Sequence, residues 1–308
     1  MQDRPRSVSF KNGVIDLAGH LRVPEGNGES RNYAAIVLAT PGSSVKEQAG
    51  ANYARRLTEK GFVTLTFDPS YQGQSGGEPR DLEIPSVRSE DIRCAVDFLA
   101  TQPCVDDGRI GLLGICAGGG YAVNAALTEY RIKALGTVVP VNIGRARRSA
   151  GPGAIRKMLE EVGQQRSEEA RGGPQRREPW IPDTLEIAQA AGITDPDVLD
   201  AVEFYRTPRG FHENSTNRLD FTSFAPMLGF DAFHLVDELL IQPLQVIVGG
   251  RKGVTHSFED GEELFAKAIN PHGFHVVEGA GHYDMYDKSP FIDEAVGKLD
   301  EFFVQYLR

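Results

Sequence analysis

The segment from residue 110 to residue 127 constrains the fold most, because it is almost free of polar side chains and rich in glycine. It holds five glycines, three of them consecutive at Gly118–Gly120. A membrane span explains this run poorly, because the chain has no second segment of this kind. We therefore predict a buried strand over 110–115, a glycine-rich turn, and a helix over 118–127.

Strand-length apolar runs alternate with helical patterns on both sides of this segment. Two alternating stretches joined by Lys11-Asn12-Gly13 predict a hairpin at a sheet edge. Buried strands are expected over 34–39, 62–67, 134–141, 244–248 and 274–277, and helices over 46–60, 86–100, 258–269 and 289–306. This alternation is typical of an α/β fold with a mostly parallel sheet covered on both faces.

The alternation stops between Asn142 and about Asp237, where helical stretches are broken by Gly and Pro and no strand-like run occurs. We predict an α/β core of residues 1–141 and 238–308, with residues 142–237 forming a helical lid inserted before the last two strands. Open sheets bind ligands at the carboxyl ends of their strands, so the lid is expected to cover that edge. The alternative is a peripheral domain away from the site.

Charge and cysteine content exclude several classes of function. The chain has 33 Lys and Arg against 43 Asp and Glu, so nucleic acid or an anionic membrane is a poor default partner. Three widely spaced cysteines build neither a disulfide framework nor a zinc site, and the first ten residues show no signal peptide. We expect a soluble cytoplasmic protein that acts on a small molecule without a metal, flavin or nucleotide cofactor. The sequence leaves its oligomeric state open, and a homodimer is one option.

The sequence Gly114-Ile115-Cys116-Ala117-Gly118 has the G-x-nucleophile-x-G form, with Cys where Ser is more usual. Glycines on both sides let a strand and a helix approach around a cramped turn that exposes the nucleophile. The free N–H groups at the start of the helix favour a thiolate. The turn lacks the patterns of a dinucleotide fingerprint or a P-loop. The competing interpretation makes Cys116 a small buried core residue.

A nucleophile of this kind requires a histidine late in the chain, after the acid. His282 follows the last predicted strand among small residues that let a loop fold back over the sheet. We therefore predict that His282 is the general base. The alternatives are a structural role for His282, or His256 as the base.

Several segments carry a family resemblance. They are 41–48 (PGSSVKEQ), 67–75 (FDPSYQGQS), the Cys116 turn, 204–210, 214–218, 230–234 and the stretch ending in His282. Over nearly its whole length the chain resembles α/β-hydrolases of the dienelactone-hydrolase type, which use Cys as nucleophile. It is more closely similar to a group that includes fungal polyketide transferases and bacterial esterase-like proteins of unassigned substrate. The resemblance implies the α/β-hydrolase fold and acyl-transfer chemistry.

The third catalytic residue departs from the family pattern. The resemblance implies an Asp in the loop after the 244–248 strand, where this chain has Gly253. Asp260 comes slightly later, although with Ser257 it also resembles the first turn of a helix. The alternative position, after the strand ending at Val141, holds Asn142. Asp260 or Asn142 is thus the candidate that orients the histidine, and a Cys–His pair tolerates an amide there better than a Ser–His pair.

Two backbone N–H groups, those of Ala117 and Ser43, are the expected oxyanion hole. Ser43 and Ser44 also fit as plain turn residues after Pro41-Gly42. Tyr71 is a candidate substrate-binding residue through its hydroxyl, with packing beneath the lid as the equal alternative.

The first part of the lid is locally basic. Residues 142–180 contain nine Lys and Arg against five Glu. Such an excess steers anionic substrates, but a solvated helix face with mixed charges explains it as well.

Three functions follow in order of preference. The first is hydrolysis of an ester, lactone or thioester through an acyl group on Cys116. The second is acyl transfer to an acceptor other than water. The third is ligand binding without catalysis, an option that Gly253 in place of the acid keeps open.

Overall fold

The structure is a computed structural model that describes residues 5–25 and 32–308. The first four residues, part of the segment predicted to lack a signal peptide, lie outside the described residues. Within the described part, none of the helices combines the length and the apolar character that a membrane span requires.

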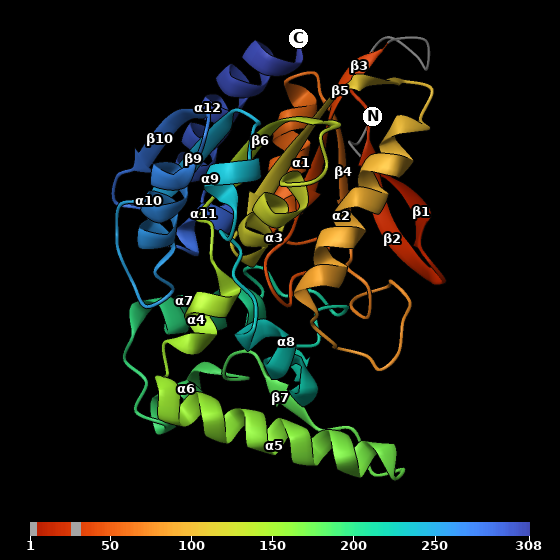
Figure 1. Cartoon of the computed structure of the whole chain (residues 1–308). Coiled ribbons are helices and arrows are strands. Elements are labelled where there is room, and N and C mark those ends of the chain that lie inside the picture. The colour runs from red at the N-terminus through yellow and green to blue at the C-terminus, as the bar shows by residue number, and fades with distance from the viewer. Residues whose placement is uncertain (1–4, 26–31) are drawn as a thin grey trace.

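An eight-stranded sheet forms the centre of the molecule, in the order β1-β2-β4-β3-β5-β6-β9-β10 (Figure 1). The β1–β2 and β2–β4 pairs are antiparallel, and all other neighbours are parallel. The strands are β1 (Arg6–Asn12), β2 (Ile15–Arg22), β3 (Tyr33–Ala39), β4 (Val63–Phe67), β5 (Val105–Ile115), β6 (Ile132–Val138), β9 (Leu244–Gly249) and β10 (Pro271–Val277). The predicted mostly parallel sheet with an edge hairpin is confirmed.

Helices cover both faces of this sheet, because its central strands are apolar on both sides. In β3, Ala35 and Val37 pack into one hydrophobic cluster while Ile36 and Leu38 pack into the other. The first cluster includes side chains of α2 (Pro85–Ala100), α3 (Ala117–Ala126) and α10 (Ser257–Lys267). The second includes side chains of α1 (Ala49–Glu59), α11 (Asp284–Asp287) and α12 (Ser289–Leu307).

The segment between β6 and β9 forms a separate set of elements beside the sheet (Figure 1). Its helices are α4 (Ile143–Arg148), α5 (Pro152–Ala170), α6 (Leu185–Ala190), α7 (Pro196–Arg206), the 3₁₀ turn η1 (Phe221–Ser223), α8 (Phe224–Leu228) and α9 (Val236–Leu239). The expected helical insertion also contains one pair of short strands, β7 (Arg177–Pro179) and β8 (Arg218–Asp220). Strands of three residues are too short to produce a recognisable apolar period.

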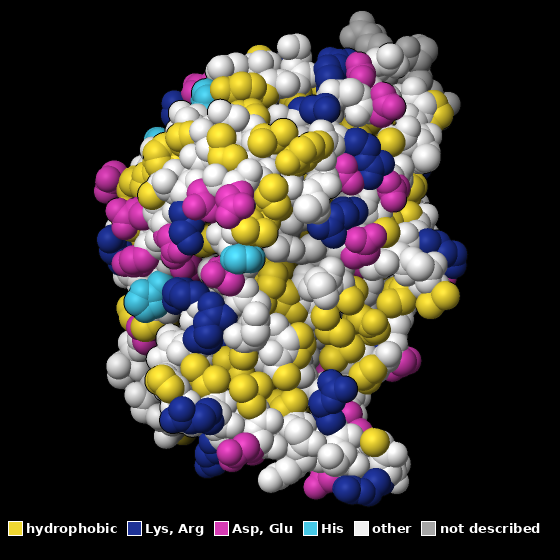
Figure 2. All heavy atoms as spheres, viewed as in Figure 1, with side chains coloured by type: hydrophobic (Ala, Val, Ile, Leu, Met, Phe, Trp, Pro, Cys, Tyr) yellow, Lys and Arg dark blue, Asp and Glu magenta, His cyan; other side chains and the backbone are white. Residues whose placement is uncertain are grey.

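Charges of both signs are interspersed on the face shown in Figure 2, and hydrophobic side chains gather in its lower half. That half lies where the inserted segment meets the core in the same view of Figure 1. The junction between the two is therefore where a ligand site is to be sought.

Gly118 determines how closely α3 approaches the sheet. A Cβ added at Gly118 would lie 2.3 Å from the carbonyl oxygen of Ala39 and 2.6 Å from that of Thr40. These are backbone atoms at the end of β3, which cannot rotate aside as a side chain can. Only glycine at this position lets the helix begin directly against the strand ends.

Replacement of Gly118 by Ala is therefore expected to destabilise the protein by about 3 kcal/mol, as overpacking of a tight contact does. Urea unfolding followed by circular dichroism measures the change. Gly297→Ala is the matched control, because an added Cβ there meets nothing within 4 Å in the middle of α12. That control is expected to gain up to about 1 kcal/mol, and equal stability of the two variants would contradict the argument.

Candidate active site

Cys116 occupies the sharp turn between β5 and α3, as the sequence predicts. Its backbone has φ +57° and ψ −127°, a conformation that costs a non-glycine residue free energy. The turn is held from outside: the Cys116 N–H donates to the Val138 carbonyl at 3.1 Å, and the Cys116 carbonyl accepts from Val141 at 2.9 Å. The strain therefore persists because the end of β6 fixes the turn on both sides.

The Cys116 thiol is surrounded by hydrogen-bond donors. The backbone N–H groups of Ala117 and Gly42 and the hydroxyl of Tyr286 interact with the sulfur, and each lowers its pKa. Burial has the larger effect and raises the pKa of Cys116 above the ordinary thiol value. The helix N-terminus thus does not make Cys116 a thiolate by itself, and the thiol needs a base.

The structure places two backbone N–H groups beside the Cys116 sulfur. Ala117, one of the two residues named from the sequence, directs its N–H at the sulfur, but the second donor there is Gly42. Ser43 lies next in the chain, at φ +60°, and lines the same cavity. Its carbonyl accepts a hydrogen bond from the Ser215 hydroxyl at 2.7 Å, which ties this loop to the inserted segment.

His282 is buried behind Tyr286. Its Nε2 lies 3.0 Å from the Tyr286 hydroxyl, and its Nδ1 lies 2.9 Å from the Ser257 hydroxyl. The Tyr286 hydroxyl therefore stands between the imidazole and the Cys116 sulfur. Burial lowers the pKa of His282 to about 4, and the carboxylate of Asp197 acts in the opposite direction. At neutral pH the imidazole is uncharged and able to accept a proton.

Neither candidate for the acid is brought to His282. Asp260 accepts from Arg145 through both carboxylate oxygens, at 2.6 Å each, and from the Asn142 N–H at 2.8 Å. The Asn142 side chain caps α4 and donates to Asp231 at 2.8 Å. The Asp260 side chain thus joins the core to the inserted segment, and the Asn142 side chain joins two parts of that segment.

Asp197 takes the place that a side chain at position 253 would need. A Cβ added at Gly253 would lie between 2.2 and 2.4 Å from the Asp197 carboxylate atoms. Asp197 comes from the first turn of α7 and is 3% exposed, and its Oδ2 accepts from the N–H and the hydroxyl of Thr255 at 3.1 and 2.7 Å. Sequence reasoning missed this residue, because an Asp after Asp195-Pro196 looks like ordinary helix capping.

Two other candidates lie away from the thiol. Tyr71 is not among the residues that line the cavity described below, and its ring lies against Gly77. His256, the alternative base, is 51% exposed by its side chain and precedes α10, with Nδ1 3.8 Å from Glu259.

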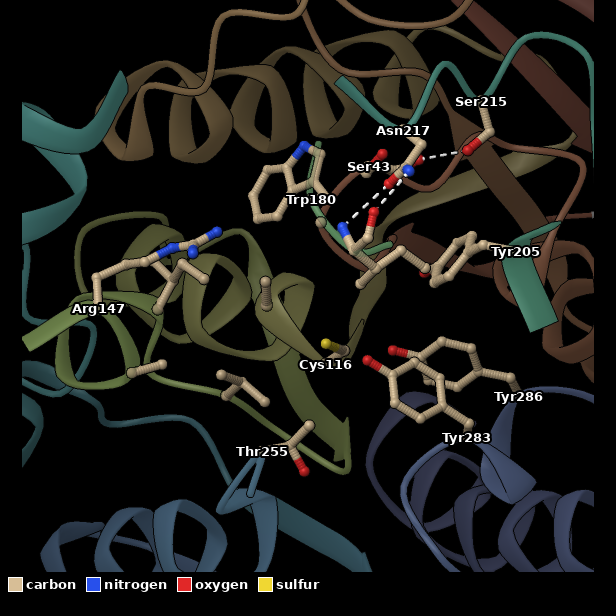
Figure 3. A pocket seen from close by; sticks show the side chains of 16 residues that line it. Ser43, Cys116, Arg147, Trp180, Tyr205, Ser215, Asn217, Thr255, Tyr283 and Tyr286 are labelled. Atoms are coloured by element: carbon tan, nitrogen blue, oxygen red, sulfur yellow. Dashed lines mark hydrogen bonds between the residues drawn. The ribbon is translucent and has the colours of Figure 1, made fainter. Parts of the chain in front are cut away.

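Cys116 opens onto a cavity of about 230 Å³ between the core and the inserted segment (Figure 3). Its walls are mainly apolar and aromatic, and Arg147 is the one charged side chain that lines it in the described structure. The lining residues are Gly42, Ser43, Cys116, Ala117, Val141, Ile143, Ala146, Arg147, Trp180, Ile181, Tyr205, Ser215, Asn217, Thr255, Tyr283 and Tyr286. No group of three or more His, Cys, Asp or Glu in residues 5–25 and 32–308 is arranged to hold a metal ion.

The aromatic side chains of this cavity were not expected from the sequence. Figure 3 shows the hydroxyls of Tyr283 and Tyr286 pointing toward Cys116. The only sequence signal for Tyr286 is its spacing, because it follows His282 by four residues, and His282 itself precedes α11. Trp180 has no such signal, since its position depends on how the inserted segment folds back.

Comparisons with known proteins show which proteins this chain is similar to in sequence and in fold. No model of a known protein family matches the chain. It is 36% identical over 313 residues to the uncharacterised protein YcjY of Escherichia coli (strain K12), covering all of both chains. The crystal structure of hypothetical protein PA2218 from Pseudomonas aeruginosa shares 34% identity with a TM-score of 0.88, over 98% of this chain and 93% of that one. The α/β-hydrolase GrgF from Penicillium sp. sh18 has a TM-score of 0.80 at 20% identity, over 98% of both chains.

The chain belongs to one family with YcjY and PA2218, and its fold is the α/β-hydrolase fold. Two fungal relatives carry more specific names. The chain is 26% identical to thiohydrolase aneE of Aspergillus aculeatus, over 94% of this chain and 89% of that one. It is 25% identical to polyketide transferase claH of Penicillium crustosum, over 90% of this chain and 89% of that one. The resemblance inferred from the motifs is confirmed, and the protein is an enzyme of the hydrolase fold.

In this hydrolase, alkylation of Cys116 by iodoacetamide is expected to speed up as the pH rises from 7 to 10, because burial raises the thiol pKa. Tyr286→Phe removes a hydrogen bond that lowers this pKa, so its profile is expected to move to higher pH. Mass spectrometry of the Cys116 peptide measures the rates. Tyr283→Phe is the matched control and is expected to leave the profile in place. A flat profile, or a shift to lower pH in Tyr286→Phe, would contradict the assignment.

Proposed function

We propose that this α/β-hydrolase cleaves the thioester or ester bond of a small acyl substrate through an acyl group carried on Cys116. The observation that carries the proposal is the Cys116 thiol itself. It faces an apolar cavity, with the N–H groups of Ala117 and Gly42 on one side and a hydroxyl–imidazole chain on the other. The thiohydrolase name of aneE supports the thioester, and lactones fit the same chemistry.

Proton transfer runs through Tyr286. The thiol gives its proton to the Tyr286 oxygen while the Tyr286 hydrogen passes to Nε2 of His282, which leaves a thiolate and an imidazolium. The thiolate attacks the carbonyl carbon, and the N–H groups of Ala117 and Gly42 stabilise the oxyanion. The leaving thiolate or alkoxide takes back the proton, and water then cleaves the acyl–Cys116 bond along the same route.

Asp197 is the charged partner of His282 in this proposal. Its carboxylate raises the pKa of His282 against the effect of burial, so it stabilises the imidazolium that forms during proton transfer. It fills the space of the side chain that is absent at Gly253. The inserted segment would thus supply the acid that the core lacks.

Intact-protein mass after brief exposure to activated esters and acyl thioesters tests the nucleophile. The wild-type protein is expected to gain one acyl group, and Cys116→Ala to gain none. Cys94→Ala is the control, because Cys94 lies in α2 away from the cavity. Faster decay of the adduct with an added alcohol or amine would favour the acyltransferase alternative, which the name of claH supports. Absence of any adduct would contradict the proposal and favour a ligand-binding protein.

The role of Asp197 is tested by moving the carboxylate. Asp197→Ala is expected to lose about a hundredfold in turnover, the usual scale of assisted proton transfer. Asp197→Ala combined with Gly253→Asp is expected to recover much of it, because the truncated residue 197 leaves room for the new side chain. Steady-state rates on a thioester that acylates the wild type measure both.

If Asp197 only holds α7 to Thr255, the double variant would recover no activity. The loss of turnover in Asp197→Ala would then parallel the fall in its melting temperature. Asp195→Ala is the matched control, since Asp195 caps the same helix end through Asp197 and Val198 N–H groups.

A further inference from the structure

Arg147 lies in α4 and forms no ion pair in the described part of the chain, although the more distant Glu83 carboxylate raises its pKa. Its Nε is buried and has no hydrogen-bond partner there. Burial lowers its pKa from the ordinary arginine value, although the guanidinium stays charged at neutral pH. Arg147 is only partly exposed, and a cation shielded from water without an ion pair is costly, so its place at a cavity wall calls for an explanation.

The neighbouring arginines show that pairing is available on this helix. Arg145 binds both carboxylate oxygens of Asp260. Arg148 donates to the carbonyls of Leu228 and Phe230 at 2.9 and 2.6 Å. Elsewhere in the inserted segment, Arg176 pairs with Glu178 at 2.7 Å. The local basic excess is thus mostly neutralised or solvated, and Arg147 is the exception.

The Arg147 side chain is directed into the cavity rather than toward solvent. Its guanidinium lies 5.0 Å from the centre of the Trp180 ring and 5.2 Å from that of Phe224. Figure 3 shows it on one side of Cys116, with Tyr283 and Tyr286 on the other. Aromatic rings on its flank hold the planar group in place while leaving its N–H groups to a ligand.

We propose that Arg147 binds a carboxylate on the acyl part of the substrate while the reacting carbonyl sits at Cys116. The inference rests on the proposed acyl chemistry and narrows its substrates to half-thioesters or half-esters of dicarboxylic acids. Val141, Ile143 and Trp180 line the same cavity and would contact the methylene chain between the two ends. Arg147 and Cys116 line the same cavity, so the acyl part that stays on Cys116 is the part that reaches Arg147, while the leaving group exits to solvent.

Matched thioesters of N-acetylcysteamine test the proposal: adipoyl, with a free carboxylate, against adipamoyl, with the neutral amide of equal length. The wild type is expected to prefer the carboxylate by about tenfold to hundredfold in kcat/KM, the range of a charged hydrogen bond in a protected site. Arg147→Met is expected to bring the ratio of the two kcat/KM values close to one, because it lowers the value for the carboxylate substrate.

Arg156→Met is the matched control, because this substitution removes the same charge from a residue that is exposed on α5 and does not line the cavity. It is expected to keep the preference. A wild type without preference, or a preference that survives in Arg147→Met, would overturn the proposal.

A separate measurement distinguishes failure of the binding site from failure of the chemistry. Binding of adipate to the Cys116→Ala protein is followed by calorimetry, with and without Arg147→Met. Adipate binding that Arg147→Met abolishes supports the anion site even when neither thioester is turned over. Equal or absent binding in both proteins would overturn it, whatever the result for Cys116.

Discussion

The backbone turn at Cys116 is the constraint on which the rest of the site depends. A positive φ at a cysteine costs of the order of 1–3 kcal/mol and persists only where surrounding bonds fix it. Hydrogen bonds to Val138 and Val141 do this, and Gly118 lets α3 start against the end of β3. Because the turn is rigid, the sulfur stays directed at the N–H groups of Ala117 and Gly42. A substrate carbonyl bound there would find its nucleophile already oriented.

Burial favours the neutral forms of the Cys116 thiol and the His282 imidazole, the two groups of the proposed proton transfer. It raises the pKa of Cys116 and lowers that of His282, so the free enzyme carries a thiol and an imidazole rather than an ion pair. The Tyr286 hydroxyl joins the two in a site largely shielded from water. In the proposed mechanism, charges arise only during the reaction, next to the carboxylate of Asp197, where a low local dielectric makes each one more effective.

Much of the fold could be predicted from the sequence, whereas the candidate site could be predicted only in part. The buried strands and the Cys116 turn are visible because apolar periodicity and glycine spacing are local properties. The acid could not be found this way. Position 253 in the core loop is a glycine and offers no carboxylate. The Asp197 carboxylate occupies the space of a side chain there, and Asp197 lies in the inserted segment. The sequence therefore points to Asp260 or Asn142, and in the structure the Asp260 carboxylate binds Arg145 instead.

The sequence by itself determined the alternation of strands and helices, the turn that exposes Cys116, and a late His282, because each follows from residues close together in the chain. Only the tertiary structure decided that Tyr286 separates the histidine from the thiol and that Arg147 faces the cavity without an ion pair in the described part of the chain. The physical reason is that burial, pairing and pKa depend on which distant side chains the packing of the inserted segment brings together.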